Sequence, residues 1–444
     1  MNSLRKDSIR PRRPLSLFSL LLGVVAVAVA GPTALRSGRA EQQGPATAAP
    51  RDEKLWQQAL KIHRRAIVID THNDVTTPMA NDDYDLSGTP PTPYRTSIER
   101  MKEGGMTAEF FSLYVKPWYV THGGAARRTL DMIDSVYRSV ERHGNDLMFA
   151  TSAADIRRAK KQGKIAALMG IEGGHAIENS LSTLREFYRL GVRYMTLTWN
   201  NTNDWADAGR GERLHNGLSD FGKEVVREMN RLGMLVDVSH VSDKTMSDAL
   251  DISKAPIIAS HSSARALTNQ PRNIPDDLLR RIAQNGGVVQ VNFYAAFIDS
   301  KAIEANAERS KRLKEQTDAL EAKFKDDPER LAEEEDKVEA ANPLPPTPLS
   351  ALIDHIDHIV KVAGVDHVGL GADFDGANDM PEGAKDVSML PNITYELLKR
   401  GYSENDIRKI LGENFLRVFA GAERVARTSS KTISGDGSVR RIAK

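Results

Sequence analysis

Histidines and carboxylates recur where short apolar runs of this chain end. The residues in question are His72, Asp74, Glu172, His240 and His261. Because side chains alternate along an extended chain, His72 and Asp74 point to the same side. Both residue types are good zinc ligands. The chain contains no Cys, so any metal must be held by histidine and carboxylate groups alone.

Any one of these residues has an ordinary structural explanation, and an HxD sequence is common. The set is different, because clustering buried His and acidic groups costs free energy unless a cation offsets the charge. Five ligands also exceed the three usual for one catalytic zinc. If Glu172 bridges, one ion sees His72 and Asp74, and the other sees His240 and His261. A hydroxide between two such ions would be a nucleophile at neutral pH.

The elements that must position these residues are eight apolar, β-branched runs separated by amphipathic stretches. These runs are Ala66–Asp70, Ala108–Val115, Ile165–Ile171, Tyr194–Thr198, Met234–Val238, Pro256–Ser260, Gly287–Phe293 and His367–Ala372. Strands alternating with helices predict an α/β fold, a (β/α)8 TIM-type barrel with its working residues at the carboxyl ends of the strands. A doubly wound open sheet is the alternative, but the first run ends in Thr71-His-Asn-Asp74 and not in a Gly-rich phosphate loop.

Helical spacing of apolar residues and helix stop signals predict the helices between these strands. The clearest are Ser219–Leu232, Asp276–Gln284, Ala351–Val362 with Ser350 as N-cap, and Ile393–Lys399. A Lys- and Glu-rich segment at about 301–348 predicts a charged helical insertion between strands seven and eight, either a solvated surface element or a lid or oligomer contact.

Several stretches together resemble the membrane (renal) dipeptidase family of zinc metallopeptidases, which have amidohydrolase-like barrels. They are Ile69-Asp-Thr-His-Asn-Asp74, Gly170-Ile-Glu-Gly-Gly-His175, Asp237-Val-Ser-His-Val-Ser242, Ser260-His-Ser-Ser-Ala264 with Pro271-Arg-Asn273, Gly371-Ala-Asp-Phe-Asp-Gly376 and Gly412-Glu-Asn-Phe-Leu-Arg-Val418. The resemblance runs from about Ile67 to Val418. It implies hydrolysis of dipeptides with two Zn²⁺ per chain and Glu172 as the bridge.

The resemblance also implies two further roles. Arg272 matches the arginine that binds the terminal carboxylate of the dipeptide, and Asp373 matches the acid that moves the proton. Asp375 is the rival for that role. Trp199 stands where the best-known members carry a substrate-contacting His, so Trp199 is a substrate-binding candidate whose single N–H donor changes the wall of the site.

Two other functions stay open at this stage. The chain could be another two-metal amidohydrolase, acting on N-acyl amino acids, lactams or esters, and Trp199 keeps that alternative alive. It could also be a zinc-binding protein without turnover. The expected partner is a small dipeptide, with a homodimer left open, and a net charge of +1 does not suggest a nucleic-acid binder.

The ends of the chain differ from its middle. Residues 1–30 combine early arginines with an apolar run and predict a signal peptide, with a retained membrane anchor as the alternative. Residues 31–52 predict a flexible leader, residues 53–426 the barrel domain and residues 427–444 a disordered tail. We therefore expect an exported protein, periplasmic or extracellular, with no stable membrane span once the signal is cleaved.

Overall fold

The computed structural model describes residues 51–88 and 94–435. The predicted signal peptide and the leader up to residue 50 lie outside these described residues. The first described helix, α1 (Glu53–Arg65), begins where Asp52 accepts a hydrogen bond from the Leu55 amide at 3.0 Å. Among the described residues, no helix is both long and apolar enough to cross a membrane.

Eight parallel strands follow one another around a nearly closed barrel. They are β1 (Ile69–Asn73), β2 (Ala108–Tyr114), β4 (Ile165–Glu172), β5 (Val192–Thr196), β6 (Leu235–Asp237), β7 (Ile258–Ala259), β8 (Val288–Val291) and β9 (Val368–Leu370). Each overlaps one predicted run, although β1 lies three residues later than the run Ala66–Asp70, and the (β/α)8 fold is confirmed. A short additional strand, β3 (Leu147–Phe149), pairs with the start of β4 and was not predicted.

The barrel closes through backbone hydrogen bonds beside the candidate ligands. The Asp373 amide donates to the His72 carbonyl at 3.1 Å, and the Asp74 amide donates to the Phe374 carbonyl at 2.9 Å. The seam between the first and last strands is therefore made by the segments that carry the chemistry.

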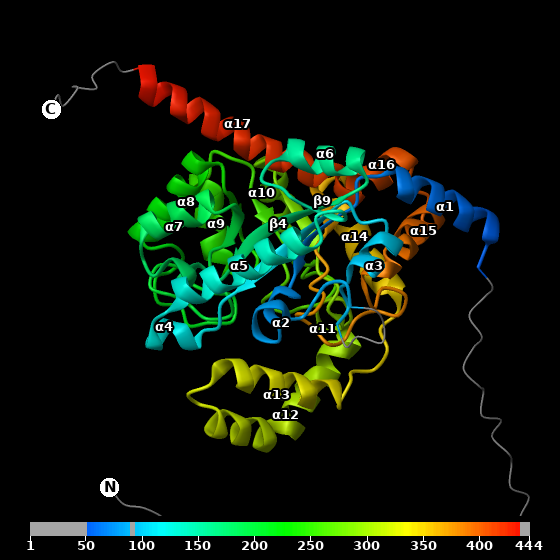
Figure 1. Ribbon diagram of the computed structural model, residues 1–444. Coiled ribbons are helices and arrows are strands. Elements are labelled where there is room, and N and C mark those ends of the chain that lie inside the picture. Colours follow the sequence, from blue (N-terminus) through cyan, green and yellow to red (C-terminus); the bar gives the residue numbers. More distant parts are fainter. Residues whose placement is uncertain (1–50, 89–93, 436–444) are drawn as a thin grey trace, which may run out of the picture. The chain divides into compact units, whose positions relative to one another are not determined.

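Helices cover the outside of the barrel (Figure 1). Those before the insertion are α2 (Thr76–Asn81), α3 (Ile98–Glu103), α4 (Trp118–His122), α5 (Ala125–Arg142), α6 (Ala153–Gln162), α7 (Leu181–Arg189), α8 (Asp220–Leu232), α9 (Asp243–Ile252), α10 (Asp276–Gln284) and α11 (Ala295–Ile298). Those after it include α14 (Leu349–Ala363), α15 (Pro391–Lys399), α16 (Glu404–Arg408) and α17 (Asn414–Gly435).

The four helices predicted most clearly are all present, but α14 and α15 each begin two residues before the predicted start, and α14 also ends one residue later. Ser219 caps α8 by accepting a hydrogen bond from the Gly222 amide, and α10 has the predicted bounds. Ser350 is not the N-cap of α14. The helix begins at Leu349, one residue before Ser350, and Pro348 occupies the cap position. Pro348 is extended and makes no side-chain hydrogen bond to the first turn, so this helix begins without a side-chain cap.

Helix α17 closes the base of the barrel, where the strands begin. Phe415 packs edge-on against Phe110 of β2, with ring centroids 5.2 Å apart, inside a buried apolar cluster shared by both. The helix continues to Gly435, so the first nine residues of the predicted disordered tail are helical, and residues 436–444 lie outside the described part.

The predicted insertion contains two antiparallel helices, α12 (Ser300–Lys323) and α13 (Pro328–Ala340). Figure 1 shows them at the end of the barrel opposite α17. Near their base, Arg309 forms a buried ion pair with Asp379 at 2.8 Å. Near their tip, Glu329 contacts Lys116 at 3.2 Å and Arg128 at 3.3 Å, both on the far side of the mouth. The insertion thus spans the mouth of the barrel, fixed on both sides.

We predict that Glu329→Gln loosens the tip of the insertion. The substitution leaves the largely buried Lys116 and Arg128 without their carboxylate, which we expect to reduce the local opening free energy by about 1–3 kcal/mol. Amide hydrogen exchange of α13 would measure this. Although burial raises the pKa of Glu329, the charges of Lys116 and Arg128 lower it overall. The stabilisation is therefore present above an ordinary carboxyl pKa of about 4.3 and is lost on acidification below it.

The matched control is Arg330→Gln on the same helix. In the described part of the chain, the ion pairs of Arg330 are those with Glu333 and Glu334, at the exposed surface of α13. Such a surface pair contributes about 0–1 kcal/mol to stability, so the amide hydrogen exchange of α13 should change little in this variant. Equal exchange in the Glu329 and Arg330 variants would show that Glu329 does not fasten the tip.

Candidate metal centre

Six polar side chains meet at the carboxyl ends of the barrel strands. His72 lies on β1 with Asp74 directly after it, and Glu172 is the last residue of β4. His240, His261 and Asp373 follow β6, β7 and β9 within three residues. All are buried except Asp373, which is partly exposed. The structure therefore brings together the five predicted ligands and the predicted proton carrier.

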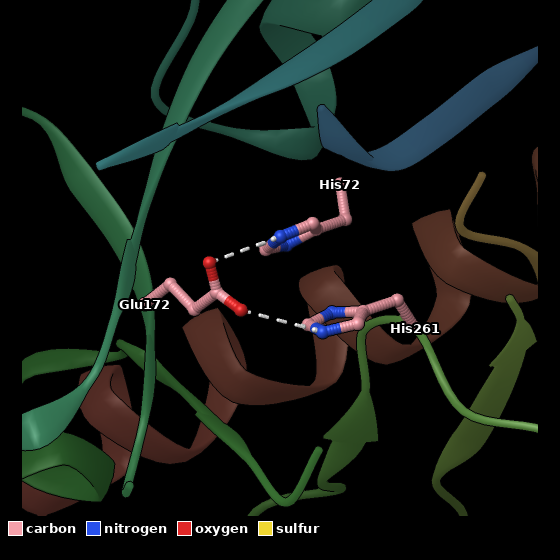
Figure 2. Close-up of side chains that lie close together, drawn as sticks. All are labelled: His72, Glu172 and His261. Atoms are coloured by element: carbon pink, nitrogen blue, oxygen red, sulfur yellow. Dashed lines mark ion pairs between the residues drawn. The ribbon is translucent and has the colours of Figure 1, made fainter. Parts of the chain in front are cut away.

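Glu172 lies between two groups of histidines. Its Oε2 is 3.5 Å from His72 Nε2, and its Oε1 is 2.8 Å from His240 Nε2 and 3.5 Å from His261 Nε2. Figure 2 shows the carboxylate placed between the His72 and His261 rings, with one oxygen facing each. Asp74 Oδ2 lies 3.4 Å from the same nitrogen, His72 Nε2.

Hydrogen bonds at Nδ1 determine which nitrogen of His261 and of His240 carries the proton. His261 Nδ1 is 2.8 Å from Ser260 Oγ, and that hydroxyl donates its own proton to Asp237 at 2.6 Å. Ser260 therefore accepts from His261 Nδ1, which leaves a lone pair on Nε2. His240 Nδ1 faces the Asn200 amide oxygen at 3.0 Å, so its Nε2 also carries a lone pair.

These two lone pairs face each other at the centre of the site. The Nε2 atoms of His240 and His261 are 2.8 Å apart, and both are beside the same oxygen of Glu172. Three acceptor atoms directed at one point repel one another, whereas a cation held between them satisfies all three. Histidine and carboxylate donors of this kind suit zinc and related divalent metals.

Burial and charge tune the protonation of the cluster. Burial lowers the pKa of His240 and His261 well below the ordinary value, and the positive charge of Arg272 adds to this. Both imidazoles are thus neutral, as metal ligands must be. Burial raises the pKa of Glu172 to about 7, an effect that His72 opposes. A bound cation would favour the ionised carboxylate instead.

The orientation of His72 depends on Tyr194, on β5. The Tyr194 hydroxyl is 2.8 Å from His72 Nδ1, which directs Nε2 toward the carboxylates. Space for the tyrosine ring comes from Gly170, where an added Cβ would lie 2.0 Å from the ring. The ring also packs against Phe110 at 5.3 Å, so aromatic contacts connect His72 to the base of the barrel.

Asp373 and Asp375 have different surroundings. Asp373 Oδ2 accepts a hydrogen bond from Asn292 at 2.8 Å, and Asp373 forms a possible ligand group with His72 and Asp74. Burial raises the pKa of Asp373. Asp375 instead accepts from the Arg95 amide at 2.6 Å, away from the histidines. Both aspartates and His240 have positive φ, between 64° and 67°, a strained conformation for residues other than glycine.

Arg272 and Trp199 form the walls beside this cluster. Arg272 is buried, and its guanidinium makes only long contacts, 3.3 Å to the His261 carbonyl and 3.5 Å to Ser262 Oγ. Its Nε has no partner among the described residues. Burial lowers its pKa to about 10. The Trp199 ring stacks beside His240, with centroids 6.0 Å apart.

Three supporting residues were missed in the sequence: Tyr194, Asn292 and Asp237. Asn292 lies just beyond β8, so the rule that strand ends carry function would have identified it. Asp237, the last residue of β6, satisfies that rule too, whereas nothing in the sequence marks the contact of Tyr194 with His72.

Three further histidines make structural contacts outside the cluster. His175 contacts the Val115 carbonyl at 2.8 Å through its Nε2. His355 is fully buried and accepts a hydrogen bond from the Ala264 amide at 3.0 Å. His358 pairs with Asp276.

A parallel barrel with buried histidines and carboxylates at its carboxyl rim defines a metal-dependent hydrolase. Residues 56–432 match the family described as membrane dipeptidase, peptidase family M19. The chain belongs to this family, and it is a metallopeptidase that acts on peptide bonds.

Solved structures agree with this assignment. The probable dipeptidase PvdM from Pseudomonas aeruginosa is 28% identical, with a TM-score of 0.72 and coverage of 85% of this chain and 100% of its own. An amidohydrolase from the same organism is 27% identical over 82% and 98% of the two chains, with a TM-score of 0.63. A metallopeptidase from Rhodobacter sphaeroides bound to a phosphinate mimic of L-Ala-D-Ala is 25% identical over 80% and 99%, with a TM-score of 0.65.

We predict that Tyr194→Phe weakens metal binding while preserving the fold. The substitution removes the hydroxyl that forms a hydrogen bond with His72 Nδ1, so the imidazole loses its fixed orientation. Loss of such a support typically reduces metal affinity about 10–100-fold. Titration against a competing chelator would measure the change.

Tyr137→Phe provides the control for removal of a tyrosine hydroxyl. Tyr137 donates to the Leu190 carbonyl at 2.9 Å, on the outer side of the barrel wall, and does not contact the cluster. The metal affinity of the Tyr137→Phe variant should equal that of the unmodified protein. Unchanged affinity in both variants would exclude the proposed role of Tyr194.

Proposed function

We propose that this metallopeptidase is a dipeptidase that hydrolyses the single peptide bond of its substrate with two zinc ions bridged by Glu172. The observation that carries the proposal is the division of the Glu172 carboxylate, whose two oxygens face separate histidine groups. One ion would be held by His72, Asp74 and Glu172. The other would be held by Glu172, His240 and His261. When bound, the ions polarise the scissile carbonyl and make water acidic enough to attack it at neutral pH.

Arg272 limits the length of the substrate. Its unpartnered guanidinium edge is suited to a carboxylate, which pairs with arginine through two parallel hydrogen bonds. Because Arg272 lies against His261, only a short substrate can reach both the arginine and the metal centre. The dipeptide mimic bound to the Rhodobacter sphaeroides relative supports a substrate of this length.

Asp373 carries the proton. It lies beside His72 and Asp74, within the group that could bind a cation, and Asn292 holds one of its oxygens. The raised pKa of this carboxyl suits a group that accepts a proton from water and returns it to the leaving amine.

Trp199 forms a flat apolar wall over His240. Its ring also packs against Tyr114 at 5.2 Å, so the two aromatic side chains together border the cluster. This wall favours a second candidate, hydrolysis of another small amide such as an N-acyl amino acid. The named amidohydrolase among the similar structures is in keeping with that alternative. The N-terminal charge and hydropathy pattern supports export as part of the proposal.

We expect the purified protein to cleave dipeptides, to lose activity on chelation and to recover it with Zn²⁺. Metal analysis of the active form should give two zinc ions per chain. Parallel assays with N-acyl amino acids decide between the two substrates. Cleavage that survives chelation, or full activity with one ion per chain, would contradict the two-zinc proposal.

We predict that Asp373→Asn lowers kcat about 10²–10⁴-fold, because the amide cannot take up the proton. Asp375→Asn is the comparison, since its carboxylate mainly holds the Arg95 amide. That variant should lower thermal stability and affect kcat less. If Asp375→Asn lowered kcat more than Asp373→Asn does, Asp375 and not Asp373 would be the residue that moves the proton.

A further inference from the structure

A second arginine lies beside the candidate substrate site, on a loop whose backbone is firmly held. Arg210 follows Gly209, whose amide donates to the His240 carbonyl at 2.6 Å. An added Cβ at Gly209 would lie only 3.1–3.2 Å from the carbonyl oxygens of His240, Val241 and Pro271. The chain at this point is therefore packed directly against two segments that carry site residues, His240 and Arg272.

Arg213 fixes the same loop from within. Its guanidinium donates to the Gly209 carbonyl at 3.1 Å and to the Gly211 carbonyl at 2.9 Å, on either side of residue 210. The Ala208 amide also donates to Thr202 Oγ1 at 3.0 Å. All of these contacts hold the backbone, and none uses the side chain of Arg210.

The guanidinium groups of Arg210 and Arg272 share a neighbour, the Phe297 ring. The guanidinium carbons of Arg210 and Arg272 lie 5.6 and 5.3 Å from the centroid of the same ring, Phe297 of α11. Within residues 51–88 and 94–435, Arg210 has no ion pair and no hydrogen bond. Its charge nevertheless acts on the site, because it contributes to the lowered pKa of both Arg272 and His240.

Two adjacent guanidinium groups without a carboxylate partner match a ligand with two negative charges. The α-carboxylate of a dipeptide needs one of them, and Arg272 is the buried one next to the metal cluster. Arg210 is the more exposed of the two, at a position that the side chain of the C-terminal residue could reach. A carboxylate there would relieve the repulsion between the two arginines.

We propose that Arg210 is a specificity-determining residue that favours dipeptides with Asp or Glu at the C-terminal position. This inference rests on the proposed dipeptidase function and adds the substrate class. The matching probe pair is Ala-Glu and Ala-Gln, which differ in charge but hardly in size. Each is assayed with an L and a D second residue.

The test compares kcat/KM for Ala-Glu and Ala-Gln in the unmodified protein and in Arg210→Gln. We expect the ratio of Glu to Gln to exceed one and to fall about tenfold or more in the variant, mainly through KM for Ala-Glu. Arg210→Lys keeps the positive charge but loses the planar, two-pronged guanidinium group, so it should retain part of the preference for Ala-Glu over Ala-Gln. Competitive inhibition by free glutamate, compared with glutamine, should weaken in parallel.

Arg227→Gln is the matched control, because Arg227 is an exposed arginine of α8 without an ion pair in the described chain. It should leave the ratio unchanged. If Arg210→Gln lowered kcat/KM equally for Ala-Glu and Ala-Gln, Arg210 would bind the α-carboxylate that both share, and the proposal would be overturned. An unchanged ratio would overturn it as well. If the unmodified protein cleaves neither probe nor any other dipeptide, the dipeptidase function itself fails, and the inference fails with it.

Discussion

The convergence of His240, His261 and Glu172 on one point is the constraint on which the rest of the structure depends. Their acceptor atoms lie 2.8–3.5 Å apart, and hydrogen bonds on the far sides of both rings fix the lone pairs inward. In a buried site this arrangement is unfavourable without a cation. The family to which the chain belongs is metal-dependent, so the unfavourable arrangement of the protein alone is what prepares it for metal.

Much of this site could be predicted because barrel strands are short, buried and apolar, so the polar residues at their ends stand out. That contrast identified Glu172 and His261 without any knowledge of their surroundings. It could not identify Tyr194, whose role depends on contact with His72 across 122 positions of the chain. The local sequence pattern could not predict β3 either. This strand is only three residues long and pairs with β4 alone, outside the continuous order of the barrel strands.

The two ends of the barrel are closed by different physical means. At the base, aromatic and aliphatic side chains of α17 fill the interior, and the contact between Phe415 and Phe110 leads on to Tyr194. At the mouth, the insertion is held mainly by charged groups, among them Glu329. Apolar packing makes the base rigid. The ion pairs at the mouth are largely buried, so salt screens them less than it would screen exposed pairs. The chain thus combines an apolar floor beneath the metal centre with a cover over the mouth that ion pairs hold on both sides.

The positive φ angles of His240, Asp373 and Asp375 link function to stability. Each places an L-residue in a backbone region that glycine would occupy with less strain. Selection for folding alone would therefore favour other residues at these positions. The rim of the barrel is a place where activity and thermal stability are opposed. Attempts to stabilise this enzyme by redesign should leave the three positions alone and seek their gains in the helices outside.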